Sequence, residues 1–290
     1  MKRYKGTRRY FCPNSAPVFI LLRFAFLLLI GCTANGQAIR QPTFLTVRDN
    51  LMYIPVKVNG RGPYNFLLNS GVTGMARIDR RLAKELGLNI VGFQQNTTGN
   101  QVKREFLVGV NQLSAGNSSH SALQLAVDEY NPVVKPQLTD GLIGQNFFDG
   151  YLITIDGPNH QWLVTKDTLS RQAKGVLTYS KSFVITGTVG SKVMPFNLDV
   201  SSNQALLFPK SSLVGVHYTD TANQQVITQG NTNFVLQEAI IQDEIVLGGL
   251  RLINQKIYYS DKVHQISIGT AFLKDHVVRF DQRKKLIRID

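Results

Sequence analysis

Two polar residues stand where apolar segments end in the two halves of this 290-residue chain, and both could take part in chemistry. Asn69 follows one such segment and is succeeded by Ser70 and Gly71, and Asp199 ends another. A carboxylate can act as a general acid or base, whereas a carboxamide has no titratable proton near neutrality. Out of context, Asn69 is typical of a turn residue that bonds to its own backbone, and Asp199 could equally be a strand-end aspartate.

An internal repeat raises both residues to site candidates. Shifts of 130 and 125 residues superpose ungapped blocks in the same order: 53–59 over 183–189, 60–69 over 190–199, and 144–156 over 269–281. Two ordered blocks at nearly the same offset indicate a duplication. Asn69 then lies over Asp199, and each half spans about 125 residues.

Each half reads as mostly β-structure. Alternating hydrophobicity predicts strands over 52–58, 183–188 and 277–280, and Asn59-Gly60 predicts a hairpin turn. One short helix is expected over 79–87, with Asp79 as its N-cap and Gly87 as its C-terminal stop, and a weaker counterpart over 209–214.

These features together resemble the pepsin and retropepsin group of aspartic peptidases. The resemblance rests on the segment IPVKVNGRGPYNFLLNSG, the helix RLAKELGL and Leu142-Ile143-Gly144 in the first half. In the second half it rests on MPFNLDVSS and on 266–269. It implies an all-β protein with few short helices, in which two retropepsin-like repeats form a bilobal, pepsin-like acid-protease fold around a cleft.

In that family two carboxylates share one proton and hold the attacking water. The resemblance assigns the two dyad positions to Asn69 and Asp199, a hydroxyl that can bond across the dyad to Ser70, and a tight-turn glycine to Gly71. The second loop departs from the family pattern, because Val-Ser stands where hydroxyl-glycine is expected. The dyad is therefore expected to be an Asn–Asp pair, and loss of proteolysis is the favoured interpretation.

Two alternatives stay open beside a degenerate protease that binds extended peptide in the inter-lobe cleft. One is an active aspartic endopeptidase that uses Asp199 with a partner acid, for which Asp140 is a weak candidate. The other is a structural or interaction protein of the envelope. A flap hairpin over the cleft is expected at 93–112, with its tip at 98–100.

The N-terminus resembles an export signal. A basic stretch precedes an apolar run of 14 residues, which is short for a membrane span, and the run ends in Leu29-Ile30-Gly31-Cys32. That ending resembles a bacterial lipobox, so Cys32 is a candidate lipidation site, with simple cleavage nearby as the alternative. Lipidation would make the chain a periplasmic or membrane-anchored lipoprotein of a bacterial cell envelope.

Composition narrows the remaining function classes. The only cysteines are Cys12 and Cys32, so the rest of the chain has neither a disulfide nor a thiolate nucleophile. The five histidines show no metal-ligand spacing, and neither a metal nor another cofactor is expected. Six cations fall in residues 1–31, which leaves +7 of the formal +13 for the rest. We expect a peptide or protein ligand, no nucleic-acid partner and a monomer.

The domain division that follows has four parts: a signal or lipoprotein leader at 1–36, an N-terminal lobe at 42–168, a linker at 169–182 and a C-terminal lobe at 183–290.

Overall fold

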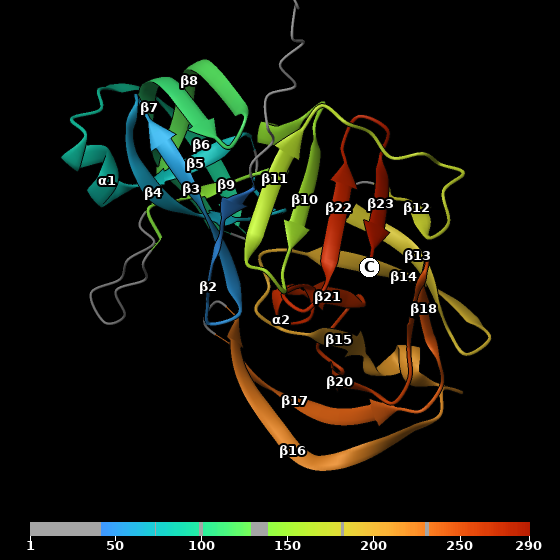
Figure 1. Ribbon diagram of the computed structural model, residues 1–290. Coiled ribbons are helices and arrows are strands. Elements are labelled where there is room, and N and C mark those ends of the chain that lie inside the picture. The colour runs from blue at the N-terminus through green and yellow to red at the C-terminus, as the bar shows by residue number, and fades with distance from the viewer. Residues whose placement is uncertain (1–41, 73, 99–100, 129–138, 181–182, 230–231) are drawn as a thin grey trace, which may run out of the picture. The chain divides into compact units, whose positions relative to one another are not determined.

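The computed structural model describes residues 42–72, 74–98, 101–128, 139–180, 183–229 and 232–290, all within one compact unit of the chain, Arg40–Asp290. Most of these residues lie in β-strands (Figure 1). The α-helices among them are two short ones, α1 (Arg80–Glu85) and α2 (Thr270–Leu273). The described residues also form the 3-10 helices η1 (Gln145–Phe148) and η3 (Lys210–Leu213). The expected all-β class with few short helices is confirmed.

The first half of the chain builds an eight-stranded sheet with the order β2-β3-β4-β9-β5-β8-β7-β6. In this sheet β4 and β9 are parallel, β9 and β5 are antiparallel, and β5 and β8 are parallel. Its strands are β2 (Thr46–Arg48), β3 (Leu51–Val58), β4 (Arg61–Leu68), β5 (Ala76–Asp79), β6 (Ile90–Thr98), β7 (Gln101–Ala115), β8 (Ser118–Asp128) and β9 (Gly141–Ile143).

The second half builds a nine-stranded sheet in the order β16-β17-β20-β15-β21-β14-β13-β18-β19. Its first seven strands correspond, in this order, to β6-β7-β8-β5-β9-β4-β3 of the first sheet, which is that sheet read from its other edge. The parallel and antiparallel pairs recur in the same places. Its strands are β13 (Val184–Val189), β14 (Lys192–Asp199), β15 (Leu206–Pro209), β16 (Tyr218–Gln229), β17 (Thr232–Ile241), β18 (Ile245–Leu247), β19 (Leu250–Leu252), β20 (Gln255–Ser260) and β21 (Ser267–Gly269). The repeat read from the sequence is thus also a repeat of strand order.

A six-stranded antiparallel sheet draws strands from both halves, in the order β1-β11-β10-β22-β23-β12. At its centre, Thr154 of β10 lies opposite Arg279 of β22, and these residues occupy the same position in the repeat. The register is therefore symmetric about this pair. The strands are β1 (Thr43–Phe44), β10 (Leu152–Asp156), β11 (Gln161–Thr165), β12 (Val176–Thr178), β22 (Val277–Asp281) and β23 (Leu286–Ile289). The segment 169–182, interpreted as a linker, contributes β12 at one edge.

Local sequence signals account for the turns and the helix. Asn59 and Gly60 both have positive φ, 51° and 78°, which is the conformation of a tight hairpin turn between β3 and β4. Asp79 caps α1 by accepting a hydrogen bond from the Arg81 N–H at 2.9 Å, and Gly87 follows the helix with φ of 65°. The predicted turn, N-cap and C-terminal stop are all confirmed.

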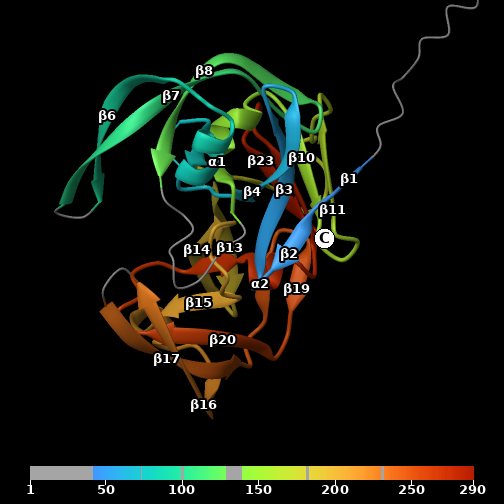
Figure 2. The same cartoon turned by 90° about the vertical axis from the view of Figure 1, so that its left-hand side faces the viewer.

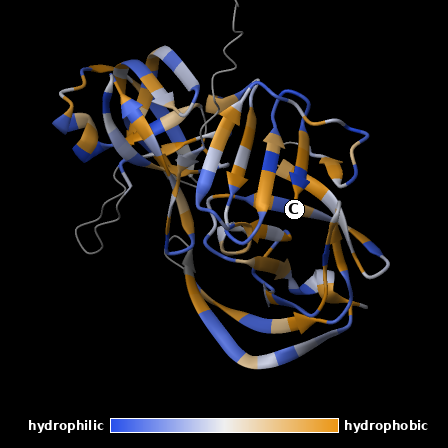
Figure 3. Ribbon diagram, viewed as in Figure 1, coloured by the Kyte–Doolittle hydropathy of each residue, from blue (hydrophilic) through white to orange (hydrophobic). Residues whose placement is uncertain are grey.

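The core runs continuously through all three sheets, and hydrophobic and hydrophilic residues alternate along many strands (Figure 3). Phe66 of β4 and Phe196 of β14 occupy the same position in the repeat, and both are fully buried. Burying a phenylalanine side chain stabilises a fold by about 1.5–3 kcal/mol. Together they fix the strands that lead into residues 69 and 199.

Candidate functional site

The first loop of the site begins where β4 ends. Its backbone is held by β9, because the Asn69 N–H donates to the Ile143 carbonyl at 3.0 Å. The Asn69 Oδ1 atom accepts a hydrogen bond from the Gly71 N–H at 2.8 Å. The amide side chain therefore closes a small turn within its own loop.

The second loop has the same internal geometry with a carboxylate in place of the amide. Asp199 is the last residue of β14 and lies opposite Gly269 of β21. Its Oδ1 atom accepts hydrogen bonds from the Ser201 N–H at 3.0 Å and from the Ser201 Oγ at 2.5 Å. In both loops an Oδ1 atom thus accepts the N–H of the residue two positions ahead.

Serine in place of glycine at position 201 does not disturb this turn. Gly71, at the equivalent position, does not have positive φ, and a Cβ built on it would meet only Asn69 Oδ1, at 3.3 Å. The turn is therefore open to residues other than glycine. Ser201 departs from the pattern of the family that the sequence resembles, and its hydroxyl donates a hydrogen bond to Asp199.

The two loops meet through a side chain. The Ser70 hydroxyl donates to Asp199 Oδ1 at 3.4 Å, which is a long contact between residues 129 positions apart. Ser70 and Asn69 also line one small apolar cavity with Val200 of the second loop. Within the described part of the chain, no hydrogen bond joins Asn69 to Asp199, and Asp199 Oδ2 accepts none.

Two glycines allow strands to pass close behind these loops. A Cβ on Gly144, just after β9, would lie 2.9 Å from the Gly74 carbonyl oxygen. A Cβ on Gly269, at the end of β21, would lie 2.2 Å from the Gln204 carbonyl oxygen. Real Cβ atoms do not approach backbone so closely, so both positions need glycine. The predicted Leu142-Ile143-Gly144 motif therefore supports the first loop sterically.

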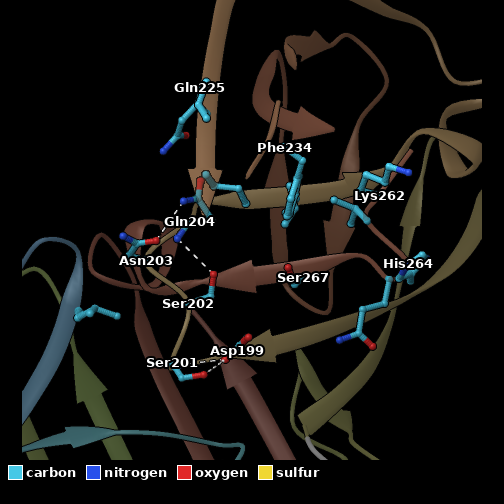
Figure 4. Close-up of a pocket in the computed structure, with 16 residues that line it drawn as sticks. Asp199, Ser201, Ser202, Asn203, Gln204, Gln225, Phe234, Lys262, His264 and Ser267 are labelled. Carbon is cyan, nitrogen blue, oxygen red and sulfur yellow. Dashed lines mark hydrogen bonds between the residues drawn. The ribbon is translucent and has the colours of Figure 1, made fainter. Parts of the chain in front are cut away.

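A large open cavity of about 760 Å³ adjoins the Asp199 loop (Figure 4). The hairpin β16–β17 of the second half forms one wall, and the loop after β20 forms another. Polar side chains predominate among the lining residues, which are Leu51, Asp199, Ser201, Ser202, Asn203, Gln204, Leu207, Gln225, Val226, Ile227, Phe234, Lys262, Val263, His264, Gln265 and Ser267.

The hairpin that borders this cavity is not the one expected. Residues 93–112 do form a hairpin, β6–β7, but none of the described residues among them lines the cavity beside Asp199. Its predicted tip at 98–100 includes residues 99 and 100, which lie outside the described residues. Figure 2 shows that β16–β17 is a separate long hairpin on the second sheet. Apart from Leu51 of β3, the lining of the cavity thus comes from the second half.

A buried glutamate anchors that hairpin. Glu238 of β17 is 5% exposed and accepts hydrogen bonds from Asn223 Nδ2, Thr221 Oγ1 and the Tyr258 hydroxyl at 3.0 Å each. The Asn223 hydrogen bond above all, aided by Thr221, Tyr258 and the nearby Lys256, outweighs desolvation and lowers the pKa of Glu238 to about 2. Glu238 is therefore an anionic structural anchor.

Asp140, the weak candidate for a partner acid, is engaged elsewhere. Its carboxylate accepts the Asn65 N–H at 2.8 Å and pairs with the Arg81 guanidinium of α1. Asn65 precedes Asn69 by four residues on β4, which corresponds to about 13 Å along a strand. Asp140 is thus held beside Asn65 in β4, away from the loop that contains Asn69.

The described residues also bear on metal binding and on membrane spans. Among the described residues, no group of three or more His, Cys, Asp or Glu side chains could hold a metal ion. No helix in the described part of the chain is long and apolar enough to cross a membrane. Cys32 and the leader at 1–36 lie outside the described residues.

A scan against models of protein families and a search of curated proteins both found no match to this chain.

Proposed function

We propose that this protein is an exported, catalytically inactive relative of the aspartic peptidases that binds an extended peptide beside Asp199. The observation that carries the proposal is the meeting of two equivalent loops, with Ser70 of one contacting Asp199 of the other at 3.4 Å. The shared strand order around both loops supports a pepsin-like arrangement of two retropepsin-like lobes.

The loss of hydrolysis follows from the pair of side chains. A dyad needs one carboxylate that accepts the proton of water and a second, protonated one that polarises the substrate carbonyl. Asn69 has no proton to exchange, and its Oδ1 atom is occupied by Gly71 N–H. Asp140, bound to Asn65 and Arg81, does not supply the missing acid.

The lining of the cavity supports a peptide ligand. Asn203, Gln204, Gln225 and Gln265 offer amide groups that can donate to and accept from a peptide backbone. The outer strand β16 forms one edge of its sheet, so its backbone can pair with an added strand. Phe234 offers an apolar surface for a side chain.

Binding and turnover in a diverse peptide pool, from acid to neutral pH, test the proposal. The wild-type chain from residue 38 onward is expected to bind peptides without cleaving them. Asp199→Asn should weaken binding about 10-fold or more, because a hydrogen bond to a charged group contributes about 1.5–3 kcal/mol. Asp261→Asn, which removes an equal charge from a surface residue, is the control.

A second pair of variants tests whether the absence of a second carboxylate is what prevents cleavage. Asn69→Asp restores two carboxylates and is expected to give cleavage at acid pH that pepstatin inhibits. Asn203→Asp, which adds a carboxylate to the cavity but not to the dyad, should give none. Cleavage by the wild type that disappears in Asp199→Asn would establish the active endopeptidase instead. Absence of both binding and cleavage would favour a structural role in the envelope.

We also propose that the leader directs export and that Cys32 carries a lipid anchor, which would place the protein on a bacterial envelope membrane. The support is the apolar run ending in Leu29-Ile30-Gly31-Cys32. Cys32→Ser should move the protein from the detergent phase to the aqueous phase in a detergent-partition assay. Cys12→Ser, the matched change at the other cysteine, should leave it in the detergent phase, and equal behaviour of the two variants would contradict lipidation.

A further inference from the structure

One end of the six-stranded sheet carries a group of cations that form no ion pair with a carboxylate among the described residues. This end is defined by Leu152, Thr165, Asp281 and Leu286, which lie side by side in the register of β10, β11, β22 and β23 (the upper end in Figure 1). We call the exposed cations there the basic end: Lys166, Arg171, Arg283, Lys284 and Lys285.

The contacts that the cations of the basic end make are with neutral groups, and the Lys166 ammonium lies 3.5 Å from the centre of the Tyr151 ring. Arg283 donates to the carbonyls of Gly150 and Lys166, and the Lys284 ammonium donates to the Leu169 carbonyl at 3.2 Å. Within the described ranges, none of the five forms an ion pair with a carboxylate. Against these five cations stand two exposed acids, Asp149 and Asp167, and the buried Asp281, so this end keeps a net positive charge.

The repeat shows that the turn does not need these charges. Residues 282–285, between β22 and β23, correspond to residues 157–160 between β10 and β11, which read Gly-Pro-Asn-His. Both turns close in the same way: Asp281 accepts the Lys284 N–H at 3.1 Å, and Asp156 accepts the Asn159 N–H at 3.1 Å. The turn with Arg283, Lys284 and Lys285 therefore has three cations where its counterpart has no Lys or Arg.

The chain enters the sheet at this same end. Thr43 of β1 lies opposite Trp162 and Phe44 lies opposite Gln161, so the residues before Thr43 come from the Thr165 side of β11. Cys32 and Pro42 are ten positions apart, and that stretch can span at most about 35 Å. A lipid on Cys32 would therefore leave the start of β1 no more than about 35 Å from its point of attachment.

From this coincidence we infer that the basic end docks on an anionic phospholipid surface and orients the protein on the membrane to which Cys32 anchors it. The inference rests on the proposed lipid anchor for its biological setting, but the surface itself can be tested without the lipid. Each Lys or Arg near an anionic bilayer strengthens binding about fivefold. Such attraction is screened as ionic strength rises.

The test uses the chain from residue 38 onward, which contains the whole compact unit and its core but lacks Cys32. Its flotation is measured with phosphatidylcholine vesicles with and without phosphatidylglycerol. Binding is expected only with phosphatidylglycerol and should disappear at about 1 M salt, where the Debye length is about 3 Å.

A matched pair of triple variants locates the surface. Arg283→Gln with Lys284→Gln and Lys285→Gln should lower the partition coefficient about 100-fold, at about fivefold per cation. Arg251→Gln with Lys210→Gln and Lys256→Gln removes the same net charge from the second half and should preserve most of the binding. Thermal unfolding of both variants checks that each is folded.

Three results would overturn the inference: no binding to anionic vesicles, an equal loss in the two triple variants, or tight binding to soluble heparin without binding to vesicles. None of these bears on the peptide site, because peptide binding by the same proteins is measured separately. Failure of lipidation is likewise separate, because the chain used here has no cysteine.

Discussion

The two halves of the molecule share a strand order but differ in where they keep negative charge. In the first half, Glu105 of β7 is 2% exposed and is paired with Arg77 at 2.5 Å, while the loop after β4 is neutral at Asn69. In the second half, Glu238 of β17 is held mainly by neutral donors, while the loop after β14 presents Asp199 to an open cavity. The same scaffold thus accepts a charged or a neutral loop.

The comparison separates the structural role of residues 69 and 199 from a catalytic one. What both loops require is an Oδ1 atom that accepts the N–H of the residue two positions ahead, at 2.8 Å in one and 3.0 Å in the other. An amide and a carboxylate both meet that requirement. The fold can therefore form both loops with an amide at one position and a carboxylate at the other.

The largest expected difference between the halves concerns the buried ion pair. Glu105→Gln deprives the Arg77 guanidinium, 8% exposed at its side chain, of the nearest carboxylate among the described residues. Removing one partner of a buried pair costs about 3–5 kcal/mol, and we expect about 3 kcal/mol because Asp128 also contacts Arg77. Urea unfolding measures the loss. Glu85→Gln, in an exposed pair with Arg81, should change the free energy of unfolding by less than about 1 kcal/mol.

If Glu105→Gln and Glu85→Gln change the free energy of unfolding equally, the Arg77–Glu105 ion pair does not stabilise the β6–β7 hairpin.

The contribution of Glu238 to the stability of the β16–β17 hairpin should depend on pH. The pKa of Glu238 is lowered from 4.5 to about 2, chiefly by the Asn223 amide. Because the folded-state pKa lies below the unfolded one, this stabilisation is fully present above pH 4.5 and is lost as the pH falls toward 2. Urea midpoints measured across this window should fall less steeply for Glu238→Gln than for the wild type. Glu244→Gln, a more exposed residue of the same half, should follow the wild type.

If the urea midpoints of Glu238→Gln and of the wild type depend on pH in the same way, the hydrogen bonds that Asn223, Thr221 and Tyr258 donate to Glu238 do not control the stability of this hairpin in acid.

The smallest expected effect makes the two loops more alike. Gly71→Ser copies the residue found at position 201, and it should change the free energy of unfolding by less than about 1 kcal/mol, because no positive φ or backbone clash opposes it. Gly144→Ser is the control, since its Cβ would lie 2.9 Å from the Gly74 carbonyl. That variant should be clearly destabilised in a thermal melt. Similar melting temperatures for both variants would contradict the packing described here.

Much of the secondary structure could be predicted because its signals are local. The Asn59-Gly60 turn, the Asp79 cap and the strands over 52–58 and 277–280 depend on hydrogen bonds and periodicities within a few residues. The hairpin that borders the cavity beside Asp199 could not be predicted in this way. Both halves contain a long hairpin, and the sequence does not tell which of them borders the cavity.

The sequence by itself determined the duplication, the all-β class and the paired positions 69 and 199, since these follow from patterns along the chain. Only the tertiary structure decided that Ser70 reaches Asp199, that Asp140 is bound by Arg81 and that β16–β17 walls the cavity. It also decided that 283–285 and the entry of the chain share one end of a sheet. These are contacts between residues far apart in sequence, and they depend on strand register and on how the sheets pack, which no local pattern specifies.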